Sequence, residues 1–408
     1  MTELTTTLSA RPFRRADRIA NIEVSEIVQI SESAAAMAAA GQDIISLGTG
    51  EPDFPTPDHV CAAATAAMKA GQTRYTPTVG TADLRLAIAA KAGVKPQNVI
   101  VSTGAKQVLS NLFLASLNPG DEVISPAPFW TSYRDIVKFS GGRLVEVPCP
   151  SEQGFKITPQ QLEAAITPAT RWLLLNTPSN PSGALYSHGE LKALAEVLRA
   201  HPNVWIASDE IYEHISYAPF TSVRAVMPDL VDRIVIINGV SKAYSMTGWR
   251  IGWAIGPESV IKAMSAVQGQ STSGACSISQ AAAVAALTGD QALITSRRAA
   301  FEARRDYVVQ SINDNPLLDC ILPEGAFYLF ISCEKTLGKM TPDGTRITDD
   351  MAFCAYVLKS AGLALIPGRA FSMPDYFRLS YAYSDAELSN GLSRLRSATD
   401  ALYGPNGN

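Results

Sequence analysis

Between residues 98 and 256 the chain alternates short apolar runs with segments of helical periodicity, and this alternation restricts the fold more than any other feature. Runs that are apolar on both faces are typical of strands covered by helices on two sides. The runs are N-V-I-V-S-T (98–103), D-E-V-I-S-P (121–126), R-W-L-L-L-N-T-P (171–178), V-W-I-A-S-D-E (204–210), R-I-V-I-I-N-G (233–239) and W-R-I-G-W-A-I-G (249–256). Such a β-α alternation predicts an α/β domain with a mostly parallel sheet.

Helix signals lie between these runs. Ser187 and Glu190 have the spacing of a capping box, in which each side chain bonds the backbone of the other residue at a helix start. Pro119 and Gly120 end a helix that begins near Lys106. Each helix therefore connects two consecutive runs, as a parallel sheet requires.

After about residue 290 the pattern changes. A long charged helix leads to strand candidates at 325–332, 363–368 and 376–382, and a final helix opens at Ser384. This order predicts a smaller α+β domain, to which both termini contribute. We expect residues 1–55 to form an N-terminal arm and part of the small domain, 56–305 the large domain, and 306–408 the C-terminal part of the small domain.

The overall charge of the chain argues against some classes of partner. The 408 residues carry a formal net charge of -4, and 18% of them are charged. This balance gives no electrostatic reason to expect nucleic acid or a membrane surface as the partner. No apolar run approaches the roughly 20 residues that span a bilayer, and the N-terminus lacks the apolar core of a secretory signal. We therefore expect a cytoplasmic protein with small-molecule ligands.

The cysteines and the N-terminal segment carry little further information. Six cysteines are scattered without a C-x-x-C pair and without histidines at metal-binding spacing, which predicts reduced thiols and no bound metal. Residues 1–15 are rich in Thr, Ser and Arg, and Glu3 and Asp17 interrupt the basic pattern of a transit peptide. We interpret this segment as a disordered or partner-clasping arm.

Polar side chains follow three of the apolar runs at the point where each run ends. Asn180 follows the run at 171–178, Asp209 and Tyr212 follow that at 204–210, and Lys242 follows that at 233–239. Taken singly, these residues read as a turn residue, a helix cap, a core-edge aromatic and a solvated charge. Ligands of open parallel sheets bind beyond the carboxyl ends of the strands. Together, the four side chains therefore predict a ligand site there.

These stretches resemble the class I/II aminotransferases, which are pyridoxal-phosphate enzymes of fold type I, and most closely their bacterial aspartate/prephenate branch. The resemblance runs from about residue 18 to the C-terminus, with the motifs in the family's order. They are G-E-P-D-F-P-T-P, G-A-K-Q, P-A-P-F-W-T-S-Y, N-T-P-S-N-P-S-G, S-D-E-I-Y-E-H, N-G-V-S-K-A-Y-S-M-T-G-W-R-I-G, P-E-G-A-F-Y and F-R-L-S-Y-A. The resemblance implies that the large domain binds pyridoxal phosphate.

The resemblance assigns catalytic roles to the residues at the strand ends. Lys242 matches the amine that bonds to the aldehyde of the cofactor and later moves a proton. Asp209 matches the carboxylate that pairs with the ring nitrogen. Tyr212 and Asn180 match the residues that hydrogen-bond the phenolic oxygen of the ring.

The phosphate of the cofactor requires donors and positive charge. Gly104, Ala105 and Lys106 lie at a predicted strand-to-helix turn, where free backbone N–H groups and the helix dipole favour an anion. Arg250 and Ser241 match family residues that add a charge and a hydroxyl. Without the resemblance, Gly104 would be a turn residue and Arg250 the partner of a surface acid.

Two aromatic residues match further contacts of the cofactor. Trp130 matches the side chain that stacks on the ring, although on its own it would be a core residue. Tyr75 matches a residue that the family sends across a dimer interface to the neighbouring phosphate. The resemblance therefore implies a homodimer with shared active sites.

Substrate contacts follow from the same resemblance. Arg378 matches the clamp of the α-carboxylate, and Gly50 matches a backbone contact close to it. Trp130 and Asn180 also belong to the substrate-binding set. Lys106 matches the partner of a distal carboxylate, which favours aspartate and glutamate, although it can equally serve the cofactor phosphate.

Two stretches of the chain depart from the branch. Glu23 stands where many relatives carry a lysine, and a glutamate facing the pocket would repel a dicarboxylate. Gly274 and Ala275 replace a proline-containing version close to the expected substrate entrance. We predict a ping-pong aminotransferase for aspartate or glutamate and their 2-oxo acids. The alternatives are a prephenate or aromatic aminotransferase and a pyridoxal-phosphate lyase on the same scaffold.

Overall fold

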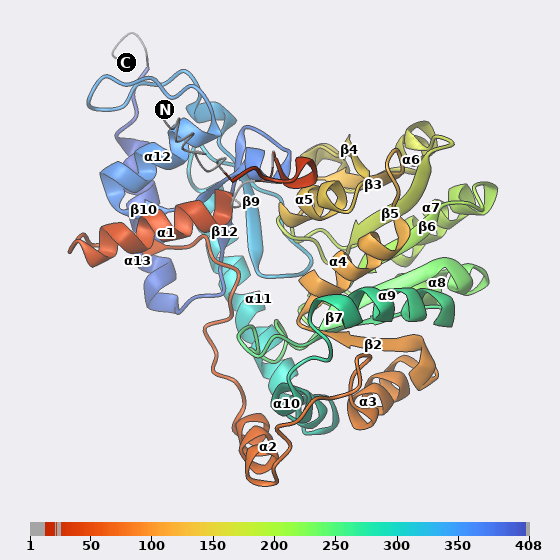
Figure 1. Cartoon of the computed structure of the whole chain (residues 1–408). Coiled ribbons are helices and arrows are strands. Elements are labelled where there is room, and N and C mark those ends of the chain that lie inside the picture. Colours follow the sequence, from red (N-terminus) through yellow and green to blue (C-terminus); the bar gives the residue numbers. More distant parts are fainter. Residues whose placement is uncertain (1–12, 21, 23–25, 405–408) are drawn as a thin grey trace, which may run out of the picture.

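A seven-stranded sheet forms the centre of the larger part of the molecule in the computed structural model, which describes residues 13–20, 22 and 26–404 (Figure 1). The strands, in spatial order, are β2 (Val99–Ser102), β8 (Gly252–Ile255), β7 (Ile234–Gly239), β6 (Trp205–Asp209), β5 (Thr170–Asn176), β3 (Glu122–Ala127) and β4 (Arg143–Pro148). Strands β7, β6, β5, β3 and β4 run parallel, and β8 is antiparallel to both of its neighbours. The prediction of a mostly parallel sheet is confirmed.

Each of the six apolar runs overlaps one of these strands, and only β4 of this sheet was not predicted. Strand β4 reads R-L-V-E-V-P, and only Val147 in it is buried. It lies at the edge of the sheet, paired with β3 alone. An edge strand of this kind is not apolar on both faces, so the pattern that identifies central strands passes over it.

Helices cover both faces of this sheet. On one face lie α2 (Asp58–Lys69), α3 (Ala82–Ala92), α6 (Pro159–Ala165), α7 (His188–Ala200), α8 (Val223–Val226) and α10 (Ser277–Thr288). On the other lie α4 (Ala105–Ser116), α5 (Ser132–Phe139) and α9 (Glu258–Ser271). The capping box of Ser187 and Glu190 is present at the start of α7, as predicted.

The smaller part of the molecule joins the two ends of the chain. Its antiparallel sheet has the order β11 (Ile366–Pro367), β12 (Tyr376–Ser380) and β9 (Tyr328–Ser332), and β1 (Ile45–Ser46) pairs in parallel with β10 (Leu363–Ala364). Its helices are α1 (Glu26–Ala39), α11 (Ala292–Asn313), α12 (Asp350–Ala361) and α13 (Asp385–Asp400). The short 3-10 helices of the chain are η1 (Asp17–Ile19), η2 (Pro96–Asn98), η3 (Ser151–Gln153), η4 (Pro228–Arg233), η5 (Glu334–Thr336) and η6 (Gly368–Phe371).

The predicted domain limits remain predictions. Helix α11 continues through residues 305 and 306, so one rigid element connects the two parts of the molecule (Figure 1). Its buried residues, which include Phe301 and Val308, lie in the core of the smaller part. The predicted N-terminal arm falls mostly on residues 1–12, which lie outside the described residues.

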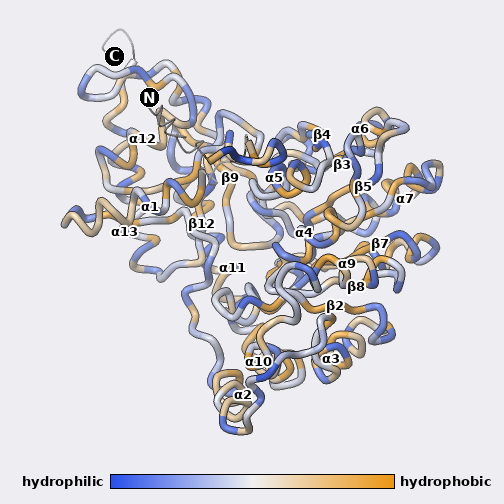
Figure 2. Tube along the Cα trace, in the orientation of Figure 1, coloured by the Kyte–Doolittle hydropathy of each residue, from blue (hydrophilic) through white to orange (hydrophobic). Residues whose placement is uncertain are grey.

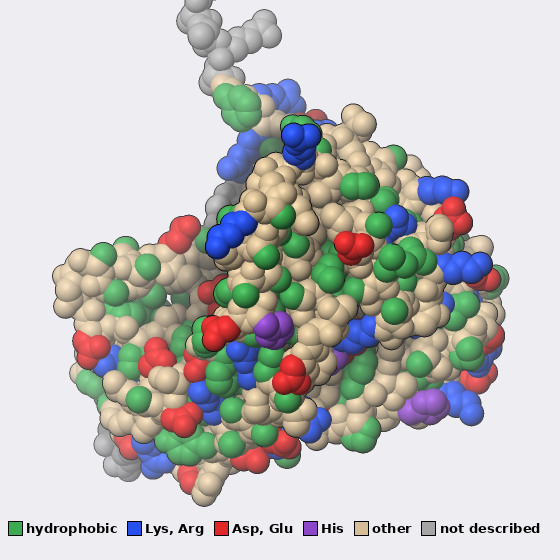
Figure 3. All heavy atoms as spheres, turned by 90° about the horizontal axis from the view of Figure 1, so that it is seen from below, with side chains coloured by type: hydrophobic (Ala, Val, Ile, Leu, Met, Phe, Trp, Pro, Cys, Tyr) green, Lys and Arg blue, Asp and Glu red, His purple; other side chains and the backbone are tan. Residues whose placement is uncertain are grey.

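Hydropathy and charge follow this layering. Figure 2 shows hydrophobic residues along the central strands and hydrophilic residues at the outer end of α7. On the face seen in Figure 3, acidic and basic side chains are interspersed. Within the described ranges, no helix is both long and apolar enough to cross a membrane.

Candidate active site

A cavity of about 490 Å³ lies at the carboxyl ends of β5, β6 and β7, where the sequence predicts a ligand site. The smaller part of the molecule supplies Arg378 and Tyr328 to its wall, so residues far apart in the chain meet there. The predicted site residues that line it are Gly50, Ala105, Lys106, Trp130, Asn180, Asp209, Tyr212, Ser241, Lys242, Arg250 and Arg378. Of the predicted set, Gly104 and Tyr75 do not line it.

Lys242 follows the end of β7 and places its amine inside the cavity. Its Nζ donates a hydrogen bond to the backbone oxygen of Gly50 over 2.7 Å. The pKa of Lys242 is lowered to about 8, mainly by burial and also by the charges of Arg378 and Arg250, while Glu51 and Asp209 oppose the shift. Because roughly one tenth of this amine is neutral at pH 7, far more than of an ordinary lysine, it can act as a nucleophile and as a base.

Asp209 is the last residue of β6 and is almost fully buried. The hydroxyl of Tyr133 donates to its Oδ2 over 2.7 Å, and the backbone N–H of Ile211 donates to its Oδ1 over 3.2 Å. Burial raises the pKa of Asp209 to about 6, although these hydrogen bonds oppose the rise. The carboxyl is therefore mainly ionised at neutral pH and can pair with a cationic group of a ligand.

Arg378 reaches the cavity from β12 and is 2% exposed. Its two terminal nitrogens donate to Asn180 Oδ1 over 2.8 Å and to the backbone oxygen of Gly48 over 2.5 Å. The guanidinium also lies 4.5 Å from the ring centre of Tyr328 and 4.9 Å from that of Phe371. Its buried Nε has no hydrogen-bond partner among the described residues. A rigidly held cation with an unused donor is suited to a carboxylate.

The start of α4 forms a cradle for an anion. Within the described part of the chain, the backbone N–H groups of Ala105 and Lys106 have no acceptor. Gly104 precedes them with a φ of 83°, and a side chain there would overlap the guanidinium of Arg250. Arg250 itself has a φ of 57°, a strained conformation that is concentrated at functional sites. Gly104 therefore acts by allowing Arg250 to approach, without lining the cavity itself.

Aromatic side chains fix the remaining groups of the cavity. Trp130 packs edge-to-face on Tyr133, with ring centres 5.6 Å apart, and Lys106 Nζ lies 4.9 Å from the centre of the Trp130 ring. Burial, followed by the charge of Arg250, lowers the pKa of Lys106. The hydroxyls of Tyr212 and Tyr328 are 2.9 Å apart. The cavity thus combines flat apolar surfaces with precisely held polar groups, as small-molecule sites do.

Several predicted positions lie elsewhere. The side chain of Tyr75 is 99% exposed and lies outside the cavity. Glu23 belongs to the residues that the structure does not describe. Gly274 packs so closely on Thr76 and the backbone of Pro77 that a side chain there would overlap them. The Gly274-Ala275 pair therefore serves the packing of this loop and does not line the cavity.

Several lining residues have no predicted role, and among them Tyr133, Asn176 and Tyr328 carry polar groups into the site. Tyr133 lies three residues after Trp130 at the end of the quoted motif P-A-P-F-W-T-S-Y, and Tyr328 ends P-E-G-A-F-Y. Helical spacing after Trp130 could have identified Tyr133. Tyr328 depends on the contact between the two parts of the molecule, which no local pattern reports.

A buried amine, a buried carboxylate and an anion cradle at the strand ends of an α/β sheet define a pyridoxal-phosphate enzyme of fold type I. The family model described as aminotransferase class I and II matches residues 42–395, and the chain belongs to this family. It is therefore a pyridoxal-phosphate-dependent aminotransferase.

Relatives and solved structures agree with this assignment. The chain is 51% identical over 404 residues to an aspartate aminotransferase of Rhizobium meliloti (strain 1021), covering 97% of this chain and 98% of the relative. It is 48% identical over 388 residues to an aspartate/prephenate aminotransferase of Cereibacter sphaeroides, covering 93% and 97%. The crystal structure of the aspartate aminotransferase from Rhizobium meliloti superposes with a TM-score of 0.93 at 51% identity, covering 96% of this chain and 100% of that one.

Proposed function

We propose that this enzyme transfers the amino group of aspartate or glutamate to a 2-oxo acid, either 2-oxoglutarate or oxaloacetate, by a ping-pong mechanism. The observation that carries the proposal is the presence of two cations, Arg378 and Lys106, around one cavity. A dicarboxylic substrate presents one carboxylate to each of them. The names of the relatives support the same substrate class.

The cavity residues fit the cofactor of the family. When bound, pyridoxal phosphate supplies an aldehyde that bonds to amines and a ring that withdraws electrons from the α-carbon of the substrate. We assign the aldehyde to Lys242 and the ring nitrogen to Asp209. A pKa of about 8 lets the amine lose its proton more readily near pH 7 than an ordinary lysine does, and a pKa of about 6 leaves the carboxyl mainly ionised there. Asn180 and Tyr212 would hold the phenolic oxygen, and Trp130 the face of the ring.

The remaining polar groups complete the assignment. The free N–H groups at the start of α4, with Ser241 and Arg250, would hold the phosphate. Arg378 would orient the α-carboxylate of the substrate through its unpartnered Nε. Lys242 would then accept the α-proton of the amino acid, because its lowered pKa matches that task.

A panel of amino donors tests the substrate class. Aspartate, glutamate, phenylalanine and alanine are compared as donors to 2-oxoglutarate, and prephenate is tested as an acceptor. We expect kcat/KM for aspartate and glutamate to exceed that for alanine by about 100-fold, the usual effect of one buried charge-assisted contact.

Replacing Lys106 with Ala should remove most of this preference and leave alanine turnover within about threefold. If Lys106→Ala lowers kcat/KM for alanine as much as for aspartate, Lys106 instead serves the cofactor phosphate. Release of ammonia without amino transfer would indicate a lyase.

We further propose that the enzyme is a homodimer in which Tyr75 completes the active site of the partner subunit. Tyr75 supports this because a large aromatic side chain that is 99% exposed lacks any contact that would retain it within one chain. Closed twofold symmetry would place both copies of the residue in equivalent interfaces. The cytoplasmic location expected from the sequence remains a prediction.

Subunit complementation tests the shared site. Lys242→Ala and Tyr75→Ala homodimers each carry one defect in every site, whereas their hybrid would combine both defects in one site and leave the other intact. We expect a mixture after subunit exchange to be more active than the sum of the separate variants. No gain in a mixture whose hybrids are demonstrated by mass spectrometry would place Tyr75 outside the active site.

A further inference from the structure

A second cavity of about 460 Å³ lies on the opposite face of the central sheet from the active site. Strand β6 connects the two, because Asp209 faces the active site and the next residue, Glu210, lines the second cavity. Helices α3, α8 and α10 and the η4 turn provide its walls. Its size is in the range of small-molecule sites.

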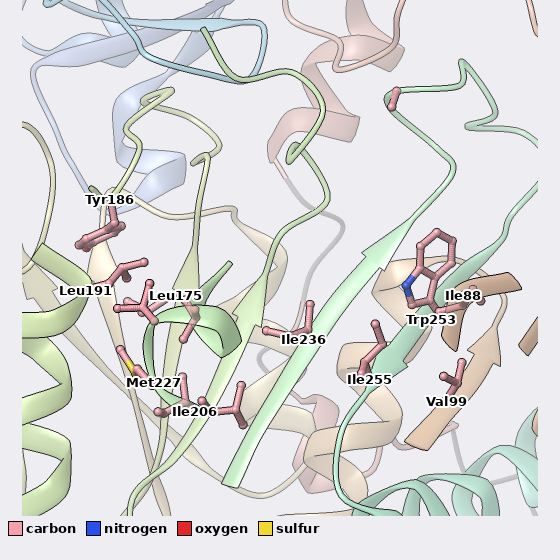
Figure 4. Packing of buried hydrophobic residues seen from close by; sticks show 14 of the residues in the cluster. Ile88, Val99, Leu175, Tyr186, Leu191, Ile206, Met227, Ile236, Trp253 and Ile255 are labelled. Carbon is pink, nitrogen blue, oxygen red and sulfur yellow. The ribbon is translucent and has the colours of Figure 1, made fainter. Parts of the chain in front are cut away.

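The floor of this second cavity consists of two cross-strand pairs on β7 and β8. Ile236 faces Ile255, and Asn238 faces Trp253. Side chains that face each other across an antiparallel pair lie on the same side of the sheet. Figure 4 shows Ile236 and Trp253 on neighbouring strands, with the indole nitrogen on the side of the ring toward Ile236. The floor is therefore apolar at one end and carries polar groups at the other.

Each polar side chain of the floor has an unused N–H donor, although Asn238 Oδ1 accepts a hydrogen bond from the backbone N–H of Gly239. Asn238 is 6% exposed and Trp253 is 4% exposed. Among the described residues, neither Asn238 Nδ2 nor Trp253 Nε1 donates a hydrogen bond to the protein, and both nitrogens retain contact with solvent. Buried N–H groups normally find an acceptor, so two unused donors side by side require a ligand or ordered water.

The charges around this cavity favour an anion. Glu213 pairs with Lys91 at 3.5 Å, which compensates its negative charge, and His214 Nε2 lies 3.0 Å from the same carboxylate oxygen. Arg224 lines the cavity and has no ion-pair or hydrogen-bond partner within the described ranges. Burial raises the pKa of Glu210 to about 8, so this carboxyl is mainly neutral at pH 7. Its Oε1 accepts from Ser208, Ser222 and the N–H of Val223, which leaves Oε2 available as a donor.

From these observations we propose that the second cavity binds a small organic carboxylate with an apolar body. The carboxylate accepts hydrogen bonds from Asn238 Nδ2 and Trp253 Nε1 and is neutralised by Arg224. The apolar body packs on Ile236 and Ile255 and on the walls formed by Ile88, Ala92, Val231 and Leu287. The site belongs to a face of the sheet that the aminotransferase reaction does not use, and it goes beyond the proposed function.

Fluorine NMR of the holoenzyme labelled with 5-fluorotryptophan tests the proposal. The chain has five tryptophans; Trp130 lines the active site and Trp253 the second cavity, so their resonances distinguish the two locations. The probe is 3-phenylpropanoate, and the Trp253→Phe spectrum assigns the resonance. We expect a saturable shift of the Trp253 resonance, whether or not the Trp130 resonance also shifts. No shift of the Trp253 signal at millimolar probe would overturn the proposal.

Two variants and one analogue define the chemistry of the site. Calorimetry should show that Arg224→Gln weakens probe binding about tenfold, the usual loss for one charge-assisted contact. Arg171→Gln is the matched control, because Arg171 is an exposed arginine on β5 outside the cavity. The neutral 3-phenylpropanamide should also bind about tenfold more weakly. Equal affinity of the amide, or equal loss in both arginine variants, would contradict an anion site.

Discussion

Two cavities of about 490 and 460 Å³ lie on opposite sides of the carboxyl end of β6. The first receives the carboxyl of Asp209, the last residue of the strand, and the second receives that of Glu210, the residue after it. Burial raises the pKa of Asp209 in the first and of Glu210 in the second. The cavities differ in their lysines. Lys242 lies in the first cavity with a pKa lowered to about 8, whereas Lys91 in the second pairs with Glu213. A buried amine without a carboxylate partner therefore distinguishes the reactive face from the binding face.

Exchanging each lysine for alanine gives the largest expected effect. Lys242→Ala should lower kcat for amino transfer by about 10⁴-fold or more, because it removes both the nucleophilic amine and the base. Lys91→Ala should leave kcat within about twofold, since its amine lies on the other face of the sheet. Steady-state rates with aspartate and 2-oxoglutarate measure both. A similar loss in the two variants would abolish the distinction between the faces.

The two carboxyls should affect stability in different pH windows. Folding raises the pKa of Glu210 from 4.5 to about 8, so the folded state retains a proton that the unfolded state has released, and stability falls as pH rises between these values. Relative to wild type, Glu210→Gln should gain stability of the order of 4 kcal/mol across that window. Asp209→Asn should gain less, with a gain that grows between pH 3.8 and about 6 and is constant at higher pH. Urea unfolding from pH 4 to 9 measures both, and identical pH profiles for wild type and Glu210→Gln would contradict the assignment.

Part of this comparison could be predicted from the sequence, and part could not. Asp209 and Lys242 follow apolar runs directly, so the position of the active site follows from local pattern and the rule for parallel sheets. Asn238 and Trp253 lie inside two of the same runs, and the sequence predicts no role for either. They become a site only because β8 pairs antiparallel with β7 and sets them opposite each other. Strand direction is a tertiary property that neither run encodes by itself.

Replacing the arginine of each cavity with lysine should affect kcat/KM strongly in the active site and little in the second cavity. Arg378→Lys should lower kcat/KM for aspartate by about 100-fold, because lysine cannot reproduce a planar guanidinium held by Asn180 and Gly48. Arg224→Lys should leave kcat/KM within about twofold, since Arg224 lines only the second cavity. Most of the loss in Arg378→Lys should occur in KM, which steady-state kinetics at several donor concentrations will show. A loss confined to kcat, with KM unchanged, would argue against a role in holding the substrate.

The smallest expected effect concerns the hydroxyls that support the two carboxyls. Tyr133 donates to Asp209 Oδ2 over 2.7 Å, and Ser222 donates to Glu210 Oε1 over 3.0 Å. The bond from Tyr133 favours the ionised form of Asp209, so Tyr133→Phe should raise that pKa above about 6 and lower kcat about tenfold near pH 7.

The pH dependence separates this positioning role of Tyr133 from simple damage to the fold. The acid limb of the rate profile should move to higher pH in Tyr133→Phe, and the loss should shrink above pH 8, where Asp209 is ionised in both proteins. Ser222→Ala removes the corresponding donor on the opposite face and should leave the profile unchanged, because the Glu210 carboxyl lines the second cavity and not the active site. A loss that is constant from pH 6 to 9 would show that Tyr133 acts through packing on Trp130 and not through the ionisation of Asp209.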